Sequence, residues 1–184
     1  QRFISLLRLA ERDDFLDKAR LLEVQNRVVD SRFGEQSYRS SQNCVGENIA
    51  WQRERIHYVP PKPEDLEGLM AGLLRTHERL QSSGIDPVIH AAIVAYGFVF
   101  LHPFEDGNGR VHRFLIHNIL ARRNYTPTGL VFPVSAVMLK DPGAYDASLE
   151  SFSRPLGPLV NYRLDEEGGM TVEGTTAGFY RYID

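Results

Sequence analysis

The stretch that decides the fold is His102-Pro103-Phe104-Glu105-Asp106-Gly107-Asn108-Gly109-Arg110-Val111-His112-Arg113. An almost wholly apolar segment, residues 88–101, leads into it, and an amphipathic segment, residues 111–123, leads out of it. We therefore expect a buried helix, a tight loop and a second helix whose first turn opens on that loop.

The loop concentrates groups that suit phosphate binding. Gly107 and Gly109 flank Asn108, so the backbone can adopt positive φ and turn several N–H groups into one concavity. At a helix N-terminus such a concavity binds anions. Arg110 and Arg113 lie three residues apart on the helix that follows, so both guanidinium groups can reach one polyphosphate.

Two further side chains add chemistry to this anion site. A carboxylate beside bound phosphate, here Asp106, usually holds Mg²⁺. His102, at the end of the apolar segment, can take a proton from an attacking hydroxyl, an effect worth about 10²–10⁴-fold in rate. Together these residues predict transfer of a phosphorus-centred group from a nucleotide to a hydroxyl.

Residues 102–113 also resemble the signature of the Fic domain family, His-Pro-Phe-x-Asp/Glu-Gly-Asn-Gly-Arg-x-x-Arg, and every fixed position is met. The resemblance covers roughly residues 38–160. It implies a mostly α fold, a Fic-type helical bundle with a small β-hairpin flap. It also implies a protein adenylyltransferase, which moves AMP from ATP to a Ser, Thr or Tyr hydroxyl of a target protein and releases pyrophosphate.

The resemblance assigns a role to each matching residue. His102 would be the general base and Asp106 would hold Mg²⁺ between the α- and β-phosphates. Phe104 would anchor the loop in the core. The nucleotide would be bound by Asp106, Gly107, Asn108, Gly109, Arg110, Arg113 and Tyr145, the last near the adenine, and the flap residues Ile56, His57 and Tyr58 would align the target by backbone pairing.

Two alternatives stay open on the same scaffold. Relatives transfer other phosphorus-containing groups or remove AMP, and nothing in residues 102–113 sets the nucleotide or the direction. A nucleotide-binding regulatory module without turnover is the other alternative, and the intact His102 argues against it, because a binding module needs no base.

Many Fic proteins also carry an inhibitory helix, Ser/Thr-x-x-x-Glu-Gly/Asn, whose Glu pairs with the second motif arginine, here Arg113. No glutamate in this sequence has both the Gly or Asn after it and the Ser or Thr four residues before it. Such a helix is therefore expected outside the sequence, on a partner, or not at all. In either of the first two cases Arg113 would be the point of control.

Composition limits the remaining classes. The 184 residues suit one domain, and a net charge of −3 gives no broad basic footprint for nucleic acid. No apolar run reaches the 18 residues of a membrane span, and no signal peptide is visible. The single cysteine, Cys44, excludes an internal disulfide and favours a reducing, cytoplasmic location. We expect sequence beyond both ends.

The pattern along the chain predicts three parts: an N-terminal helical segment (1–37), the Fic core (38–160) and a small β-rich extension (161–184) that continues beyond the last residue. In the first part, a helix within residues 3–29 would turn Phe15, Ala19, Leu22, Asn26 and Val29 to one side. Further helices are expected over 64–81, 87–101, 111–123, 134–139 and 142–153, with strands at Val45, 56–59, 162–164, 170–172 and 180–183. The first two strands would form a hairpin around Trp51, and His112 is expected on an exposed helix face.

Overall fold

The computed structural model describes Leu6, Ala10 and residues 13–48, 54–127 and 129–181, and helices dominate it. The helices are α2 (Lys18–Val28), α3 (Pro63–Gln81), α4 (Pro87–Leu101), α5 (Asn108–Arg122), α6 (Val134–Lys140), α7 (Pro142–Leu156) and α8 (Ala177–Tyr180), with 3₁₀ turns at Ser31–Phe33 and Gly157–Leu159. Two antiparallel hairpins pair β1 (Val45–Asn48) with β2 (Glu54–Tyr58) and β3 (Tyr162–Leu164) with β4 (Met170–Val172). The predicted mostly α fold with a flap hairpin and a small β tail is confirmed.

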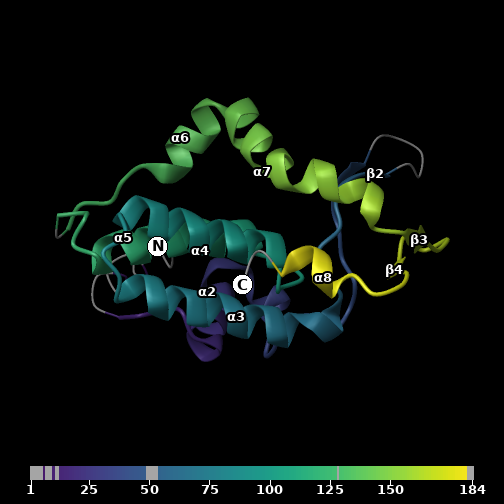
Figure 1. Ribbon diagram of the computed structural model, residues 1–184, viewed down its shortest axis with the longest axis horizontal. Helices are drawn as coiled ribbons and strands as arrows, with labels where there is room; N and C mark the ends of the chain where they lie inside the picture. Colours follow the sequence, from purple (N-terminus) through teal and green to yellow (C-terminus); the bar gives the residue numbers. More distant parts are fainter. Residues whose placement is uncertain (1–5, 7–9, 11–12, 49–53, 128, 182–184) are drawn as a thin grey trace.

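The core lies around α4, which packs against α3 on one side and α5 on the other, while α2 covers α5 (Figure 1). Val111, Leu115 and Ile119 of α5 are fully buried, as their spacing predicts. Helices α6 and α7 arch over this bundle and join it to the flap (Figure 1). The bundle therefore holds the end of α4 and the start of α5 together at one of its own ends.

Local signals explain why α4 and α5 begin and end where they do. The Asp86 carboxylate accepts the N–H groups of Val88 and Ile89, and Pro87 occupies the first helical position, so α4 starts as predicted. Helix α5 ends before Asn124, which adopts the left-handed conformation at φ 54°. The start of α4 and the end of α5 are thus fixed by short sequence signals.

Helix α2 lies within the range predicted to be helical but turns a different face inward. It starts at Lys18, because the Asp17 carboxylate caps it by accepting the N–H of Arg20. Phe15 lies before the helix, where its ring meets Phe114 edge-on with the centroids 5.0 Å apart. Phe15 and Val29 are buried as expected, but Ala19 and Asn26 of the predicted inner face are exposed. Helix α2 instead buries Leu21, Val24 and Gln25, because Phe15 does not belong to the helix from whose spacing the inner face was predicted.

The C-terminal residues form the predicted β3–β4 hairpin, but Tyr180 and Arg181, the described part of the predicted last strand, lie at the end of a helix. Tyr180 ends the short helix α8, and its fully buried ring directs its hydroxyl to the Val59 carbonyl at 2.7 Å. Residues 182–184 and Trp51 lie outside the described residues. The division of the chain at 37/38 and 160/161 stays a prediction.

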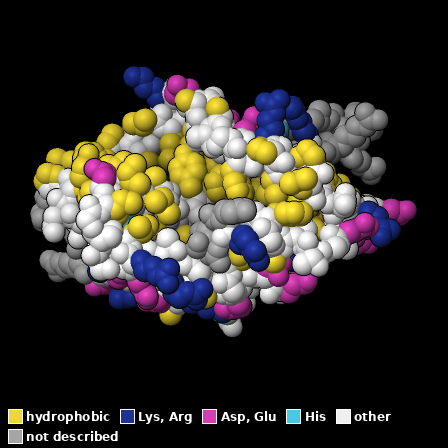
Figure 2. Space-filling view, in the orientation of Figure 1, with side chains coloured by type: hydrophobic (Ala, Val, Ile, Leu, Met, Phe, Trp, Pro, Cys, Tyr) yellow, Lys and Arg dark blue, Asp and Glu magenta, His cyan; other side chains and the backbone are white. Residues whose placement is uncertain are grey.

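The first half of α4 is less covered than its composition predicts. Val88, Ile89 and Ile93 are 44%, 50% and 40% exposed, and Val137 and Leu139 of α6 are also exposed. Figure 2 shows hydrophobic side chains gathered over this side of the molecule. Helices α3 and α5 cover two sides of α4, which leaves the third side open between the bundle and α6. None of the described helices has the length and apolar character needed to cross a bilayer.

Asn118 of α5 ties the N-terminal segment to the bundle. Its buried amide donates to the carbonyls of Ala10 and Asp13, both at 2.8 Å, and accepts the N–H of Phe15 at 3.3 Å. Asn118→Ala leaves these buried backbone groups unpaired, so we expect urea denaturation to show a loss of roughly 3 kcal/mol in the free energy of unfolding. Asn124→Gly, an exposed left-handed position, should change it by less than about 0.5 kcal/mol; an equal effect of the two variants would contradict this role for Asn118.

Candidate active site

His102 terminates α4 in an unusual backbone conformation. It is the C-cap of the helix in the left-handed region, at φ 49° and ψ 55°, and its N–H is bonded to the Phe98 carbonyl. Its ring nitrogen Nδ1 lies 3.2 Å from the Val99 carbonyl oxygen. A carbonyl only accepts, so Nδ1 carries the proton and Nε2 presents its lone pair. The helix end thus fixes both the direction and the tautomer of the imidazole.

The surroundings keep this imidazole neutral. Burial is the main cause that lowers the pKa of His102 from 6.5 to about 4, the Val99 hydrogen bond opposes this, and the positive charge of Arg39 adds to the lowering. Among the described residues Nε2 has no hydrogen-bond partner. The imidazole of His102 is therefore uncharged over the whole neutral pH range, and its Nε2 can accept a proton.

The loop after His102 is closed by Asn108 and Phe104. The Phe104 ring is fully buried, and the Asn108 amide both accepts the Phe104 N–H at 3.0 Å and donates to the Phe104 carbonyl at 2.7 Å. Gly107 at φ 92° completes the turn, and a Cβ there would lie 2.8 Å from a Val29 methyl carbon. The side chain of Asn108 is thus used to shape the loop, which leaves its backbone N–H for a ligand.

The first turn of α5 provides an anion site. Among the described residues, the backbone N–H groups of Asn108 and Gly109 have no acceptor, and Arg113 has no hydrogen bond or ion pair. One Arg113 nitrogen lies 3.5 Å from where a Gly109 Cβ would be, so the guanidinium lies beside this turn. Unpaired donors and a free cation at a positive helix end favour phosphate.

Asp106 and Arg110 are bound to each other. One Arg110 nitrogen lies 2.8 Å from both Asp106 carboxylate oxygens, and another donates to the Val28 carbonyl at 2.8 Å. Asp106 also accepts the N–H of Gly107 at 2.6 Å. Arg110 is therefore directed to its own loop and to the end of α2, and its predicted contact with phosphate would require this pair to open.

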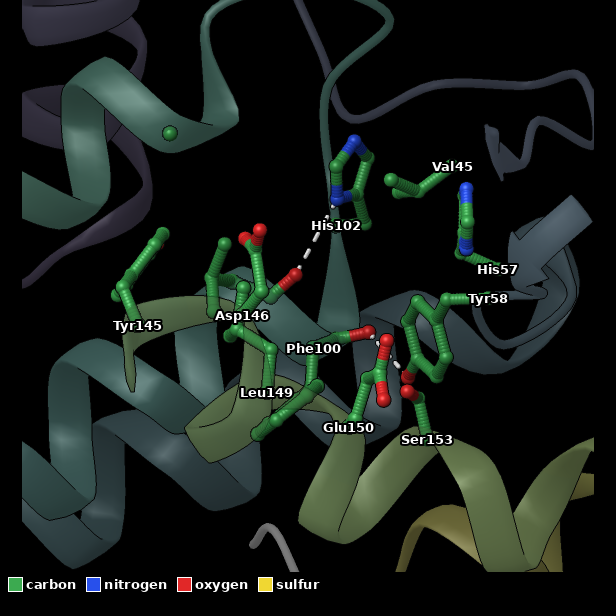
Figure 3. Close-up of a pocket in the computed structure, with 12 residues that line it drawn as sticks. Val45, His57, Tyr58, Phe100, His102, Tyr145, Asp146, Leu149, Glu150 and Ser153 are labelled. Atoms are coloured by element: carbon green, nitrogen blue, oxygen red, sulfur yellow. Dashed lines mark hydrogen bonds between the residues drawn. The ribbon is translucent and has the colours of Figure 1, made fainter. Parts of the chain in front are cut away.

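A cleft of about 360 Å³ lies between the flap, the end of α4 and α7 (Figure 3). It brings together predicted site residues from three parts of the sequence. These are His102 with Gly109, the flap residues His57 and Tyr58, and Tyr145. Asp106, Arg110 and Arg113 do not line it. The cleft thus joins His102 and the start of α5 to the β1–β2 hairpin and to Tyr145.

The hydroxyl groups of two predicted contact residues, the buried Tyr58 and the half-buried Tyr145, lie close to polar atoms of the protein itself. The Tyr58 hydroxyl donates to the Phe100 carbonyl at 2.7 Å, which fixes β2 to α4 (Figure 3). The Tyr145 hydroxyl lies 3.3 Å from Nδ1 of His112, and the two rings are stacked with centroids 6.2 Å apart. His112 is fully buried, which corrects the exposed position expected for it. Ile56 is half-buried, and His57 is exposed although it lines the cleft.

Sequence reasoning missed the residues that support the loop from outside the motif. Glu35 accepts the N–H groups of Glu105 at 3.0 Å and Asp106 at 3.5 Å, and the buried Gln25 amide donates to the Asp106 carbonyl at 3.2 Å. Burial raises the pKa of Glu35, and the two backbone bonds oppose this. These partners lie about 70–80 positions before the loop, and the sequence carries no local signal for them.

The comparisons with known proteins agree with this geometry. The family model described as Fic/DOC family matches residues 15–120, more than half of the chain, and the chain belongs to this family. It is 37% identical over 122 residues to the protein adenylyltransferase Fic of Culex quinquefasciatus, which is 65% of this chain and 22% of that protein. Over 70 residues it is 44% identical to the protein of the same name from Drosophila ananassae, 38% of this chain and 14% of that one. The chain thus spans about a fifth or less of these relatives.

Solved structures show the same fold. A Fic domain containing signaling protein from Bacteroides thetaiotaomicron superposes with a TM-score of 0.62 at 22% identity, covering 82% of this chain and 53% of that one. A Fic family protein from Desulfovibrio desulfuricans gives a TM-score of 0.56 at 26% identity, covering 98% of this chain and 47% of that one. The Fic-type helical bundle is therefore confirmed.

The buried histidines make the fold sensitive to acid. Burial lowers the pKa of His90, His102 and His112 from 6.5 to about 4, so between these pH values the unfolded chain binds protons that the folded chain does not. The free energy of unfolding should therefore fall as pH decreases from 6.5 to 4. Urea denaturation at a series of pH values measures how the free energy of unfolding changes with pH. In His112→Phe the number of protons taken up on unfolding should be lower by about one. A stability that is constant over this range would contradict the burial of neutral imidazoles.

Proposed function

We propose that this chain is the catalytic domain of a protein adenylyltransferase, which transfers AMP from ATP to a Ser, Thr or Tyr hydroxyl of a target protein. The observation that carries the proposal is the bare Nε2 of the neutral His102, in one cleft with Gly109 at the start of α5. The relatives named protein adenylyltransferase support the same reaction class.

In the proposed reaction, the groups of the cleft and of the first turn of α5 have the following roles. The target hydroxyl gives its proton to Nε2 of His102 as its oxygen attacks the α-phosphorus of ATP. A new O–P bond forms, and the bond from the α-phosphorus to the oxygen shared with the β-phosphate breaks, so pyrophosphate leaves. The N–H groups of Asn108 and Gly109 stabilise charge on the phosphate oxygens, and Arg113 would bind the distal phosphates.

Asp106 would hold Mg²⁺. Its carboxylate is half-exposed beside the anion site, and the described residues contain no group of three or more His, Cys, Asp or Glu that could ligate a metal. One carboxylate suits Mg²⁺, which is commonly bound through one or two carboxylates together with substrate phosphates and water. The ion would neutralise charge on the nucleotide phosphates, and Arg110 would have to release one or both Asp106 oxygens to admit it.

The flap would bind the target and Tyr145 would lie near the adenine. His57 lines the cleft with His102, which places the flap strand beside the base. Arg113 would also be the point of control, because a glutamate from a segment outside this sequence or from a partner could pair with its free guanidinium. Removing that segment or partner should raise activity if this control exists.

The central test compares the wild type with His102→Ala in a transfer assay. With ATP labelled at the α-phosphate, Mg²⁺ and cell lysate as the source of targets, we expect His102→Ala to lose at least about 10²-fold in label transfer, since the general base is gone. Its Kd for ATP should stay within about twofold, because the ring contributes little to binding. His117→Ala, a half-buried histidine outside the cleft, is the matched control.

The alternatives predict different outcomes of the same assay. Transfer from UTP, GTP or CDP-choline in place of ATP, read by intact-protein mass, would indicate another phosphorus-containing group. Loss of AMP from a modified target would indicate the reverse direction. Nucleotide binding without transfer, or full activity in His102→Ala, would contradict the proposed mechanism.

Arg113 allows a separate test of the phosphate site. Arg113→Ala removes a charged donor beside the first turn of α5, so we expect the KM for ATP to rise by about tenfold or more. The exposed Arg154, on α7, serves as the control in Arg154→Ala, which should leave this KM unchanged. An unchanged KM in Arg113→Ala would place the distal phosphates elsewhere.

A further inference from the structure

Arg39 is a buried cation outside the cleft. Its side chain is only 4% exposed, and each of its three nitrogens donates to a different backbone carbonyl. Nε donates to His102 at 2.9 Å, one terminal nitrogen to Ser41 at 2.8 Å and the other to Pro61. The Arg39 backbone N–H donates to the Pro103 carbonyl at 2.8 Å.

This arrangement is costly for a structural residue. Among the described residues no carboxylate lies within ion-pair distance of Arg39, and burial lowers its pKa to about 10. The carboxylate of Glu105, which makes no ion pair with Arg39, acts as a counter-charge, but its effect is smaller than that of burial. The reason for burying this charge must therefore lie in which carbonyl groups Arg39 binds.

The acceptors belong to two parts of the site. His102 and Pro103 begin the catalytic loop, and Pro61 follows the flap strand β2, which ends at Tyr58. Two nearby side chains bond to the same two parts of the site. Gln42 donates to the Pro60 carbonyl at 3.0 Å, and Asn43 donates to the Phe104 carbonyl at 3.1 Å. We call residues 39–43 the flap strap, since they bond to the base of the flap and to the catalytic loop.

We propose that Arg39 is a positioning residue, which holds the flap and His102 in a fixed relation so that a target bound to the flap meets Nε2. This inference rests on the proposed transfer reaction. The hydrogen bond from Arg39 to the His102 carbonyl fixes the residue that has the left-handed backbone. The hydrogen bond from Arg39 to the Pro61 carbonyl fixes the chain that follows β2. A displacement of about 1 Å between reacting groups can cost about 10²-fold in rate, so a rigid link here has a direct effect.

The charge of Arg39 has a second effect on the same base. It contributes to the low pKa of His102, after burial. Other ionisable groups around the imidazole are His57 on β2, Asp146 and Glu150 on α7, all of which line the cleft. Of these groups and Arg39, only Arg39 acts on the pKa of His102 to a resolved extent.

Two substitutions separate the geometric effect from the charge. Arg39→Lys keeps the charge but cannot reach three carbonyls, and Arg39→Met keeps the length but loses both. We expect kcat for protein modification to fall by about 10- to 100-fold in both, with the Kd for ATP within about twofold of the wild type. The acid limb of the kcat/KM profile should move to higher pH in Arg39→Met only, because loss of a nearby positive charge raises the pKa of the base.

Arg123 supplies the matched control, because its guanidinium also donates to backbone carbonyls, those of Leu80, Gln81, Ser83 and Ile85, far from the cleft. Arg123→Met should lower stability without changing kcat or the pH profile. If the Arg39 and Arg123 variants lose activity only in proportion to their stability, or if Arg39→Lys keeps the wild-type kcat, the positioning role is wrong.

Hydrogen exchange tests the link without any assay of transfer. Amides of β2 should exchange faster in both Arg39 variants than in the wild type, and at the wild-type rate in Arg123→Met. Absence of transfer in the wild type would overturn the proposed function, whereas unchanged exchange in β2 would overturn the link itself. The two failures are therefore distinguishable.

Discussion

The two hydrogen bonds between the Asn108 amide and the Phe104 backbone are the constraint on which the site depends. They close the turn of residues 104–108, whose aromatic ring is fully buried, and so fix the loop after α4 to the first residue of α5. One side of this closed loop carries the left-handed His102, and the other carries the unpaired N–H groups of α5. The proposed base and the proposed anion site are thereby held in place before any ligand binds, which is the arrangement that electrostatic catalysis requires.

Support for this loop comes from distant parts of the chain. Glu35 and Gln25 bind its backbone from the N-terminal segment, and Arg39 binds its first residues from the flap strap. Tyr180 fixes Val59 from the C-terminal helix, next to the prolines that Arg39 and Gln42 contact. The active-site loop is thus the meeting point of segments that the bundle itself does not connect, so a change in any of them can reach the site.

The sequence predicts those parts whose causes are local. Helices α3, α4 and α5, the caps at Asp86 and Asn124, the flap hairpin and the loop with its glycines follow from short-range periodicity, capping and turn chemistry. It does not predict the partners chosen in three dimensions: the Asp106–Arg110 pair, the burial of His112, or the place of Tyr180. It also predicts the wrong inner face for α2, because Phe15 lies before the helix and packs against Phe114 instead of belonging to the apolar face of the helix.

The central claim is that α4 ends by presenting a neutral His102 with its proton on Nδ1 and a free lone pair on Nε2. Nitrogen-15 NMR of the histidine-labelled protein, with His102→Ala used to assign the signals, measures this directly. At pH 7 we expect a protonated, hydrogen-bonded Nδ1 and an unprotonated Nε2 for His102. An imidazolium at this pH, or a proton on Nε2, would contradict the account.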